Sequence, residues 1–360
     1  SSSSSSTLPR VPFHTPVRAG TFEYLQGTGY NVAVADIFTK DLNSDSVDEV
    51  VFAGRQTQPA TVPNWRNSNI TIFGWNVNNT FSNETSRWFR AGDNVILGTE
   101  PSVKFGDFNG DGRPDMLIAP STDMQHYGPG YVYLNNGTQF TKQALNFGNV
   151  WAHDSAVADF NRDGKADFLV TDYNGRMSIA FGTASGTPVI ASASNLSGSA
   201  VAVGDFLNNG TLTIIKTDTS TNAGGGFDTK LISISVSGTT ITSSDVATLP
   251  GSRFNLPKWS GIVNASASHE IRALPFDFNN DGKLDVIVIS TPGGSGTYNE
   301  VQFLKNNGSG NFTDVTDTVL VGYNTATMAS YNPTLVDING DGLMDIFLSA
   351  PDYNLSLIHI

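Results

Sequence analysis

The fold of this chain is decided by the stretch DFNGDGRPD at residues 107–115, which is followed at once by the apolar segment MLIA at residues 116–119. Oxygen-bearing side chains stand at positions 1, 3, 5 and 9 of this nine-residue loop. They can converge on one hard cation, with the carbonyl oxygen of position 7 as a further ligand. Glycine at position 6 permits the sharp turn with positive φ that folds a loop around an ion. The stretch therefore predicts a metal-binding turn between two strands.

The same loop recurs along the chain, each time before a short apolar segment. Clear copies begin at Asp107, Asp159, Asp277 and Asp337, and a looser copy begins at Asp41, with Ser46 at position 6 and Glu49 at position 9. A sixth copy begins at Asp205 but has Leu207, Asn209 and Thr213 at positions 3, 5 and 9. Its single carboxylate gives too little charge to hold a divalent cation, so we expect this copy to turn without metal.

The ligand chemistry indicates Ca²⁺, because hard oxygen donors in a flexible set of six or seven favour that ion. The loop opens like an EF-hand, but its last acid stands at position 9 rather than 12, and strand-forming residues follow it. The alternative is a set of solvated Asx turns at hairpin ends, which five copies in phase make the weaker interpretation. We expect about four to five ions, held by side chains at positions 1, 3, 5 and 9 and by the position 7 carbonyl: Asp41, Asn43, Asp45, Val47, Glu49; Asp107, Asn109, Asp111, Arg113, Asp115; Asp159, Asn161, Asp163, Lys165, Asp167; Asp277, Asn279, Asp281, Lys283, Asp285; Asp337, Asn339, Asp341, Leu343, Asp345.

The spacing of the loops predicts a repeat architecture. Loops that begin at residues 41, 107, 159, 205, 277 and 337, with several short strands in each unit, are typical of a propeller or solenoid. An apolar strand leads into each loop, a second leaves it, and a hairpin follows, as at Asn136-Gly137 and Asn307-Gly308. We therefore expect an all-β propeller of four-stranded antiparallel blades, with the apolar residue at position 2 packed between neighbouring blades.

With these loops, the chain resembles the FG-GAP/VCBS repeat family, whose β-propeller repeats also occur in integrin α-subunit heads and in some lectins. The resemblance covers roughly residues 30–353 and implies a calcium-binding propeller of seven blades when complete, of which five full blades and a partial sixth are visible here. We expect a Ser-rich linker at residues 1–12, the propeller at 13–354 and a tail at 355–360 that does not match the repeat. Either residues 13–25 supply closing strands or the chain is part of a larger polypeptide; we favour the second.

Composition limits the class of protein. The chain has no cysteine, a net charge of −13, and no apolar run long enough to span a membrane. Five bound Ca²⁺ ions would offset most of the negative charge, and the acidity argues against nucleic acid as a partner. These features suit an extracellular or cell-surface protein, most simply a bacterial one.

No catalytic motif stands out. Neighbouring residues on an extended segment point in opposite directions, so His153, Asp154 and Ser155 do not form a relay. If there is a ligand face, we expect it on the rim opposite the loops, where Trp65, His126, Tyr127, Trp151 and His153 fall; packing between blades is an equal alternative for these side chains. Three functions remain open: a non-catalytic module for adhesion or ligand binding with a glycan or protein partner, a carbohydrate-binding lectin, and a polysaccharide-active enzyme such as a lyase.

Overall fold

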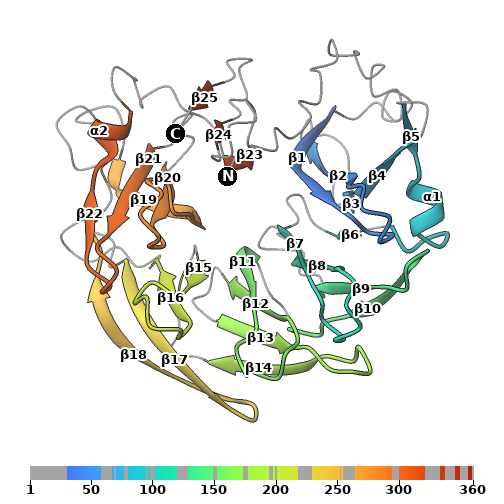
Figure 1. Ribbon diagram of the computed structural model, residues 1–360, viewed down its shortest axis with the longest axis horizontal. Helices are drawn as coiled ribbons and strands as arrows, with labels where there is room; N and C mark the ends of the chain where they lie inside the picture. The colour runs from blue at the N-terminus through green and yellow to red at the C-terminus, as the bar shows by residue number, and fades with distance from the viewer. Residues whose placement is uncertain are drawn as a thin grey trace, which may run out of the picture.

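The structure is a ring of small antiparallel sheets arranged around a central axis (Figure 1). It is a computed structural model that describes residues 31–57, 67–68, 70–76, 80–94, 96–97, 102–119, 129–148, 152–172, 177–193, 198, 201–217, 229–251, 253, 264–293, 300–320, 333–336, 345–348 and 356–358. Within them are five four-stranded sheets, one three-stranded sheet and one two-stranded pair. The predicted all-β propeller architecture with four-stranded antiparallel blades is confirmed.

Each blade is formed by strands that follow one another in the chain. In chain order, blades 1 to 3 are β1 (Asn31–Lys40), β2 (Glu49–Thr57), β4 (Ile70–Trp75) and β5 (Phe81–Asn83); β7 (Ser102–Gly106), β8 (Asp115–Ala119), β9 (Tyr131–Asn135) and β10 (Phe140–Ala144); β11 (Ala152–Ala158), β12 (Asp167–Asp172), β13 (Met177–Phe181) and β14 (Val189–Ala193). Blades 4 to 6 are β15 (Val201–Gly204), β16 (Thr213–Lys216), β17 (Lys230–Ser237) and β18 (Thr240–Thr248); β19 (Asn264–Pro275), β20 (Val286–Gly293), β21 (Glu300–Asn306) and β22 (Phe312–Asp314); β23 (Pro333–Val336), β24 (Asp345–Leu348) and β25 (Ser356–Ile358).

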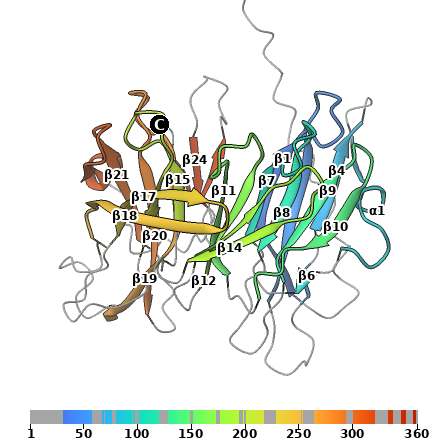
Figure 2. The same ribbon diagram turned by 90° about the horizontal axis from the view of Figure 1, so that it is seen from below.

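The first strand of each blade lies nearest the axis and the last strand lies on the outside (Figure 1). Seen from the side, the sheets stand next to one another as tilted layers (Figure 2). The second strand of blades 2 to 5 therefore lies between two neighbouring sheets (Figure 1), and every residue of β8 is buried. This is why the segments after the loops are continuous apolar runs rather than alternating ones.

The position 2 side chains pack between blades, as predicted. Leu42 shares a cluster with Val103 and Tyr133 of blade 2, and Phe206 of blade 4 shares one with Val286 and Leu304 of blade 5. The other described members, Phe108, Phe160 and Phe278, are also buried. Ile338, the sixth member, lies outside the described residues.

Three features differ from the expectation. Residues 356–358 form β25, which pairs with β24, so blade 6 gains a third strand from the tail that was expected to match no part of the repeat. β3 (Asn67–Ser68) and β6 (Ile96–Leu97) form a small extra pair. Short helices follow the last strands of blades 1 and 5, namely α1 (Thr85–Trp88) and α2 (Thr316–Val319).

The helices have a common construction. A hydroxyl in each first turn, Thr85 Oγ1 or Thr316 Oγ1, accepts the N–H of the third strand at Ile72 or Phe303. Neither helix approaches the length needed to cross a bilayer, and no other helix in the part of the chain described here does so.

Candidate metal centres in the acidic loops

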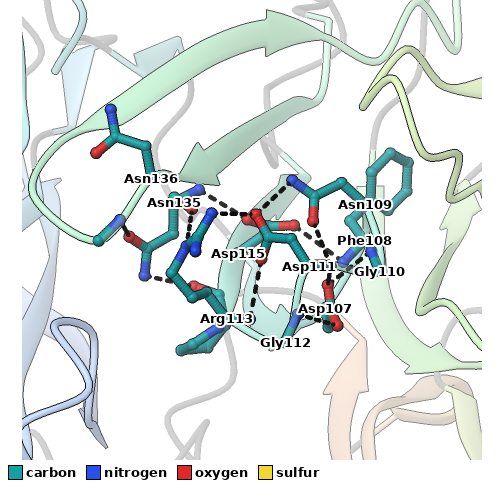
Figure 3. Close-up of polar contacts among 12 residues, drawn as sticks. Asp107, Phe108, Asn109, Gly110, Asp111, Gly112, Arg113, Asp115, Asn135 and Asn136 are labelled. Carbon is teal, nitrogen blue, oxygen red and sulfur yellow. Dashed lines mark hydrogen bonds and ion pairs between the residues drawn. The ribbon is translucent and has the colours of Figure 1, made fainter.

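The five described loops occupy the same place in their blades, between the first and the second strand. In each, the position 1 carboxylate accepts the backbone N–H groups of positions 5 and 6, at 2.7 to 3.2 Å. Both bonds occur in every described loop, and in the loops at 41, 107 and 159 the position 3 Oδ1 also accepts the N–H of position 5. Position 1 therefore shapes the loop, and Figure 3 shows this arrangement for Asp107.

The turn requires two residues with positive φ. Position 6 has φ between 70° and 85° in all five loops, including the copy with Ser46 in place of glycine. Position 4 is also positive, at 52° to 76°, and is glycine only at Gly110. The sequence pattern indicated the first of these positions but not the second, because four different residue types stand at position 4.

The side chain at position 5 caps the next part of the loop. Its oxygen accepts the N–H of position 7 at 2.8 to 3.1 Å in all five loops. Where position 7 is basic, its side chain also pairs with the position 5 carboxylate: Arg113 with Asp111, Lys165 with Asp163 at 3.4 Å, and Lys283 with Asp281 at 3.9 Å. Position 7 was predicted only as a carbonyl ligand, so this pairing is an additional finding.

The acid at position 9 is the buried member of the set. Asp115, Asp167 and Asp285 are fully buried, and Glu49 is 3% exposed. Asp115 accepts the N–H of Phe108 at 2.9 Å and that of Asn135, at the end of the third strand, at 2.7 Å. Glu49 accepts the N–H of Leu42 at 2.7 Å, so the longer acid in the looser loop reaches the same place.

Burial makes these acids hard to ionise. Loss of water around the carboxylate raises the pKa of Asp115 to about 7, partly offset by the two backbone hydrogen bonds. The same cause raises the pKa of Asp167 and that of Asp285 to about 6, and it also raises the pKa of Glu49. The negative charges at positions 1 and 5 act in the same direction, as Asp277 and Asp281 do on Asp285. A bound cation would remove this penalty.

The position 3 amide lies against the acids. Asn43 Nδ2 is 2.7 Å from Glu49 Oε1, and Asn279 Nδ2 is 2.6 Å from Asp285 Oδ2. In the loops at 107 and 159 the same amide approaches the position 5 carboxylate instead, at 2.9 and 3.4 Å. The Oδ1 atom of Asn279 is buried without a hydrogen-bond partner.

The residues present fit a calcium ion by their chemistry. Each of the loops at 41, 107, 159 and 277 combines three carboxylates, an amide oxygen and a position 7 carbonyl, and the partnerless Asn279 Oδ1 is one such oxygen. Within the described residues, no three acidic or histidine side chains already stand in metal-holding geometry. A bound ion would therefore draw the position 1 and position 5 carboxylates toward the buried acid.

The Asp205 copy keeps its turn although the ligand set is lost. Asp205 makes both position 1 bonds, and Asn209 Oδ1 accepts the N–H of Thr211 at 3.0 Å. Thr213 replaces the buried acid: its hydroxyl accepts the N–H of Phe206 at 3.4 Å and donates to the Gly204 carbonyl at 3.0 Å. That the Asp205 loop binds no metal ion is still a prediction.

Several predicted residues lie outside the description. These are Asp337, Asn339, Asp341 and Leu343 of the last loop, and Trp65, His126, Tyr127 and Trp151 of the proposed ligand face. Asp345 begins β24 and His153 lies in β11, but their side chains are not described. Asp154, beside His153, is buried, and its carboxylate accepts the N–H groups of Ser155 and Val201.

Sequence reasoning missed two asparagines that contact position 9 acids. Asn135 and Asn306 are the first residues of two Asn-Asn-Gly turns, and each donates its backbone N–H to a position 9 acid. Both asparagines also contribute to the turn, since Asn135 Oδ1 accepts the N–H of Gly137 and Asn136 Oδ1 accepts the N–H groups of Thr138 and Gln139. The repeated first asparagine was the available signal.

Comparison with known proteins agrees with this geometry. Residues 41–118, 107–170, 159–215 and 277–348, together more than half of the chain, match the FG-GAP-like repeat. A search of curated proteins found no match.

A search of solved structures also found similar chains. The chain is similar to the structure of BBS1N in complex with ARL6DN, with 11% identity, 90% of this chain and 91% of that chain covered, and a TM-score of 0.45. It is similar to the V. cholerae biofilm matrix protein Bap1, with 14% identity, 79% and 39% covered and a TM-score of 0.41, and to rhamnogalacturonan lyase YesW, with 13% identity, 93% and 73% covered and a TM-score of 0.41. These likenesses concern the fold alone, whereas the repeats matched in its sequence show that this chain belongs to the FG-GAP-like repeat family.

Proposed function

We propose that this chain is a calcium-stabilised, non-catalytic propeller module of a secreted or surface protein, and that it serves in adhesion or ligand binding. The observation that carries the calcium part is the buried acid at position 9. In four loops the acid at position 9 is buried, and at least one further carboxylate of the same loop raises its pKa. A buried charge of this kind is costly unless it is neutralised.

Ca²⁺ would supply that neutralisation, held by the position 1, 3, 5 and 9 side chains and the position 7 carbonyl. The loops join the first two strands of a blade, so the ion would tie these strands together. Binding to the folded state alone would then raise the free energy of unfolding by mass action. The role of the ion is structural.

The adhesion or binding part rests on the scaffold. A rigid ring whose loop rim is committed to turns leaves the opposite rim for recognition, where loops carry function on rigid scaffolds. The buried carboxylate of Asp154 accepts two backbone N–H groups, which supports a structural role for this acid. The partner class is an extracellular glycan or protein.

Thermal melts of metal-free protein, with and without excess Ca²⁺, test the calcium part. Ca²⁺ should raise the melting temperature, and Mg²⁺ should raise it less because it demands a stricter geometry. Asp107→Ala should remove one site from a calorimetric titration, whereas Asp205→Ala, in the copy without a ligand set, should remove none. Identical melts with and without Ca²⁺ would refute the proposal.

The binding part needs a separate test. A glycan array and the substitutions Trp65→Ala, Tyr127→Ala and Trp151→Ala address it. A binding loss of about 1–3 kcal/mol per ring with an unchanged melting temperature would support recognition. Lower stability without a specific binding defect would contradict it.

A further inference from the structure

A buried asparagine joins each of two acidic loops to the preceding blade. Asn135 ends β9 and is 1% exposed, and Asn306 ends β21 and is fully buried. In each case the position 9 acid accepts a hydrogen bond from the backbone of this asparagine, and the asparagine side chain reaches the preceding blade.

The backbone N–H and the side chain of Asn135 together make four hydrogen bonds. Its backbone N–H donates to Asp115 Oδ1 at 2.7 Å, and its Oδ1 accepts the N–H of Gly137 at 2.7 Å. Its Nδ2 donates to the Pro114 carbonyl at 3.2 Å and to the Leu42 carbonyl of blade 1 at 2.7 Å. Figure 3 shows Asn135 beside Asp115 and Arg113. An aspartate here would place an anion against two carbonyls and a carboxylate, so the amide is required.

The contact continues into the first loop. Leu42 is position 2 of the Asp41 loop, and its own N–H donates to Glu49 Oε2 at 2.7 Å. A continuous series of hydrogen bonds thus runs from Asp115 through Asn135 and Leu42 to Glu49. It joins the buried position 9 acids of two neighbouring blades.

We infer that Asn135 couples the metal loops at Asp41 and Asp107, so that filling one loop favours filling the other. This rests on the proposed calcium function. An ion in the Asp107 loop would fix Asp115, and through the Asn135 backbone it would fix the amide that holds Leu42. Leu42 then presents its N–H to Glu49 in the position that the loop at Asp41 needs. Asn135 acts through Asp115 and Leu42 and is a positioning residue rather than a ligand.

Blade 5 provides an internal control. Asn306 repeats all four bonds, to Asp285 Oδ1 at 2.7 Å, the Phe206 carbonyl at 2.8 Å, the Leu284 carbonyl at 2.9 Å and the Gly308 N–H at 3.0 Å. Its partner loop, however, has Thr213 in place of the acid. The link is present, but it leads to a loop without a metal set, so the Asp277 site should behave independently.

Blade 3 lacks the side chain altogether. Gly182 stands at this place and keeps the backbone bond to Asp167 Oδ1 at 2.9 Å. A Cβ there would lie 2.4 Å from the Phe108 carbonyl, so no side chain fits. The loops at 107 and 159 are joined instead by a backbone bond from Ala166 N to the Asp107 carbonyl at 2.8 Å, which side-chain substitution leaves in place.

The test is a calorimetric calcium titration of metal-free protein with matched position 5 substitutions. Asp45→Ala should remove one site and weaken one other by roughly three- to tenfold, the loss expected for one net hydrogen bond. Asp281→Ala should remove one site and leave the others unchanged. In the Asn135→Ala background, Asp45→Ala should remove its own site only. Asn136→Ala removes turn bonds but not the link, and should leave the coupling intact.

The outcomes distinguish the inference from the proposal beneath it. No calcium binding by the unsubstituted chain removes both. The inference alone is overturned if the calcium sites of the unsubstituted chain are independent, or if their coupling survives Asn135→Ala. It is also overturned if the only effect of Asn135→Ala is an equal fall in melting temperature with and without Ca²⁺. Circular dichroism checks the folding of Asn135→Ala. If that variant does not fold, the contrast between Asp45→Ala and Asp281→Ala in the otherwise unchanged chain decides.

Discussion

Without calcium, the stability of the folded protein should fall as the pH rises, which is the reverse of the usual pH dependence of an acidic protein. Asp115, Asp167 and Asp285 hold their protons in the folded, metal-free state at a pH where the unfolded chain has released them. A raised folded pKa contributes stability that is fully present below the unfolded pKa and is lost as pH rises through the folded pKa. For these acids the window lies between about pH 4 and pH 7.

The size of the effect follows from the shifts. Raising the pKa of Asp115 from 3.8 to about 7 corresponds to ~4 kcal/mol, and raising Asp167 and Asp285 to about 6 corresponds to ~3 kcal/mol each. Metal-free protein should therefore lose several kcal/mol of stability between pH 5 and pH 8. The proposed Ca²⁺ would keep the acids ionised and paired, so the difference in stability between the metal-free and calcium-loaded forms should grow over the same range.

The assay is urea unfolding of dialysed metal-free protein at pH 5, 6, 7 and 8, repeated in excess Ca²⁺. Dialysis is preferable to EDTA, because the chelator binds weakly at low pH. Metal-free stability that is flat or rises with pH would refute the role of the buried acids. A calcium effect of equal size at every pH would show that the ion does not displace their protons.

Asp115→Thr is a matched control taken from the Asp205 loop, where Thr213 stands at position 9. It keeps an acceptor for the Phe108 N–H but removes the titrating group and one hydrogen bond. Without metal, the variant should be less stable than the unsubstituted chain at pH 5, by about 1 kcal/mol. The deficit should close or reverse by pH 8. An equal deficit at both pH values would contradict the assigned burial cost.

Three further predictions concern occupancy and packing. Calorimetry should find four to five calcium sites, and Ser46→Gly should tighten the weakest one, because Ser46 has φ 70°. Phe140→Ala should lower the free energy of unfolding in urea by about 3–5 kcal/mol, because Phe140 is 1% exposed and lies against Trp88 and Phe89. Phe81, at the equivalent place in blade 1, is 52% exposed, so Phe81→Ala should lower it by under about 1 kcal/mol. Equal losses would contradict the packing. Arg253→Ala should lower the free energy of unfolding by about 3–5 kcal/mol, because the buried guanidinium pairs with Glu300, Asp314 and Asp317. Lys230→Ala breaks an exposed pair with Asp245 and should lower it by under about 1 kcal/mol. Similar losses would show that burial does not determine the strength of these ion pairs.

The sequence predicted the blades because one loop marks each of them. A loop that joins the first two strands fixes the register of a unit, and an Asn-Gly turn places the last two strands of blades 2 and 5. β25 was missed because residues 355–360 contain neither signal, and their pairing depends on the exposed edge of β24. The two helices were missed because four residues are too few to show a periodicity.

The spacing also placed the acidic residues of each unit in one loop, but it did not show their separate structural roles. Spacing alone cannot show that position 9 is buried while position 5 is exposed, because burial depends on the third strand and on the neighbouring blade. The link through Asn135 joins residues 93 positions apart in sequence, and its only local trace is the repeated first asparagine of the Asn-Asn-Gly turns.

The Asp205 loop shows which of these roles depends on an ion. With one carboxylate it still makes both position 1 bonds and the same pair of positive-φ residues, so the shape of the turn does not require the other acids. What it loses is the buried charge at position 9, which Thr213 replaces with a neutral hydroxyl. Position 9 is also where the third strand donates its N–H, through Asn135, Gly182 or Asn306. The charge that calcium would neutralise therefore lies where loop, third strand and neighbouring blade meet. An ion bound there would stabilise the packing of blades around the ring more than the turn that holds it.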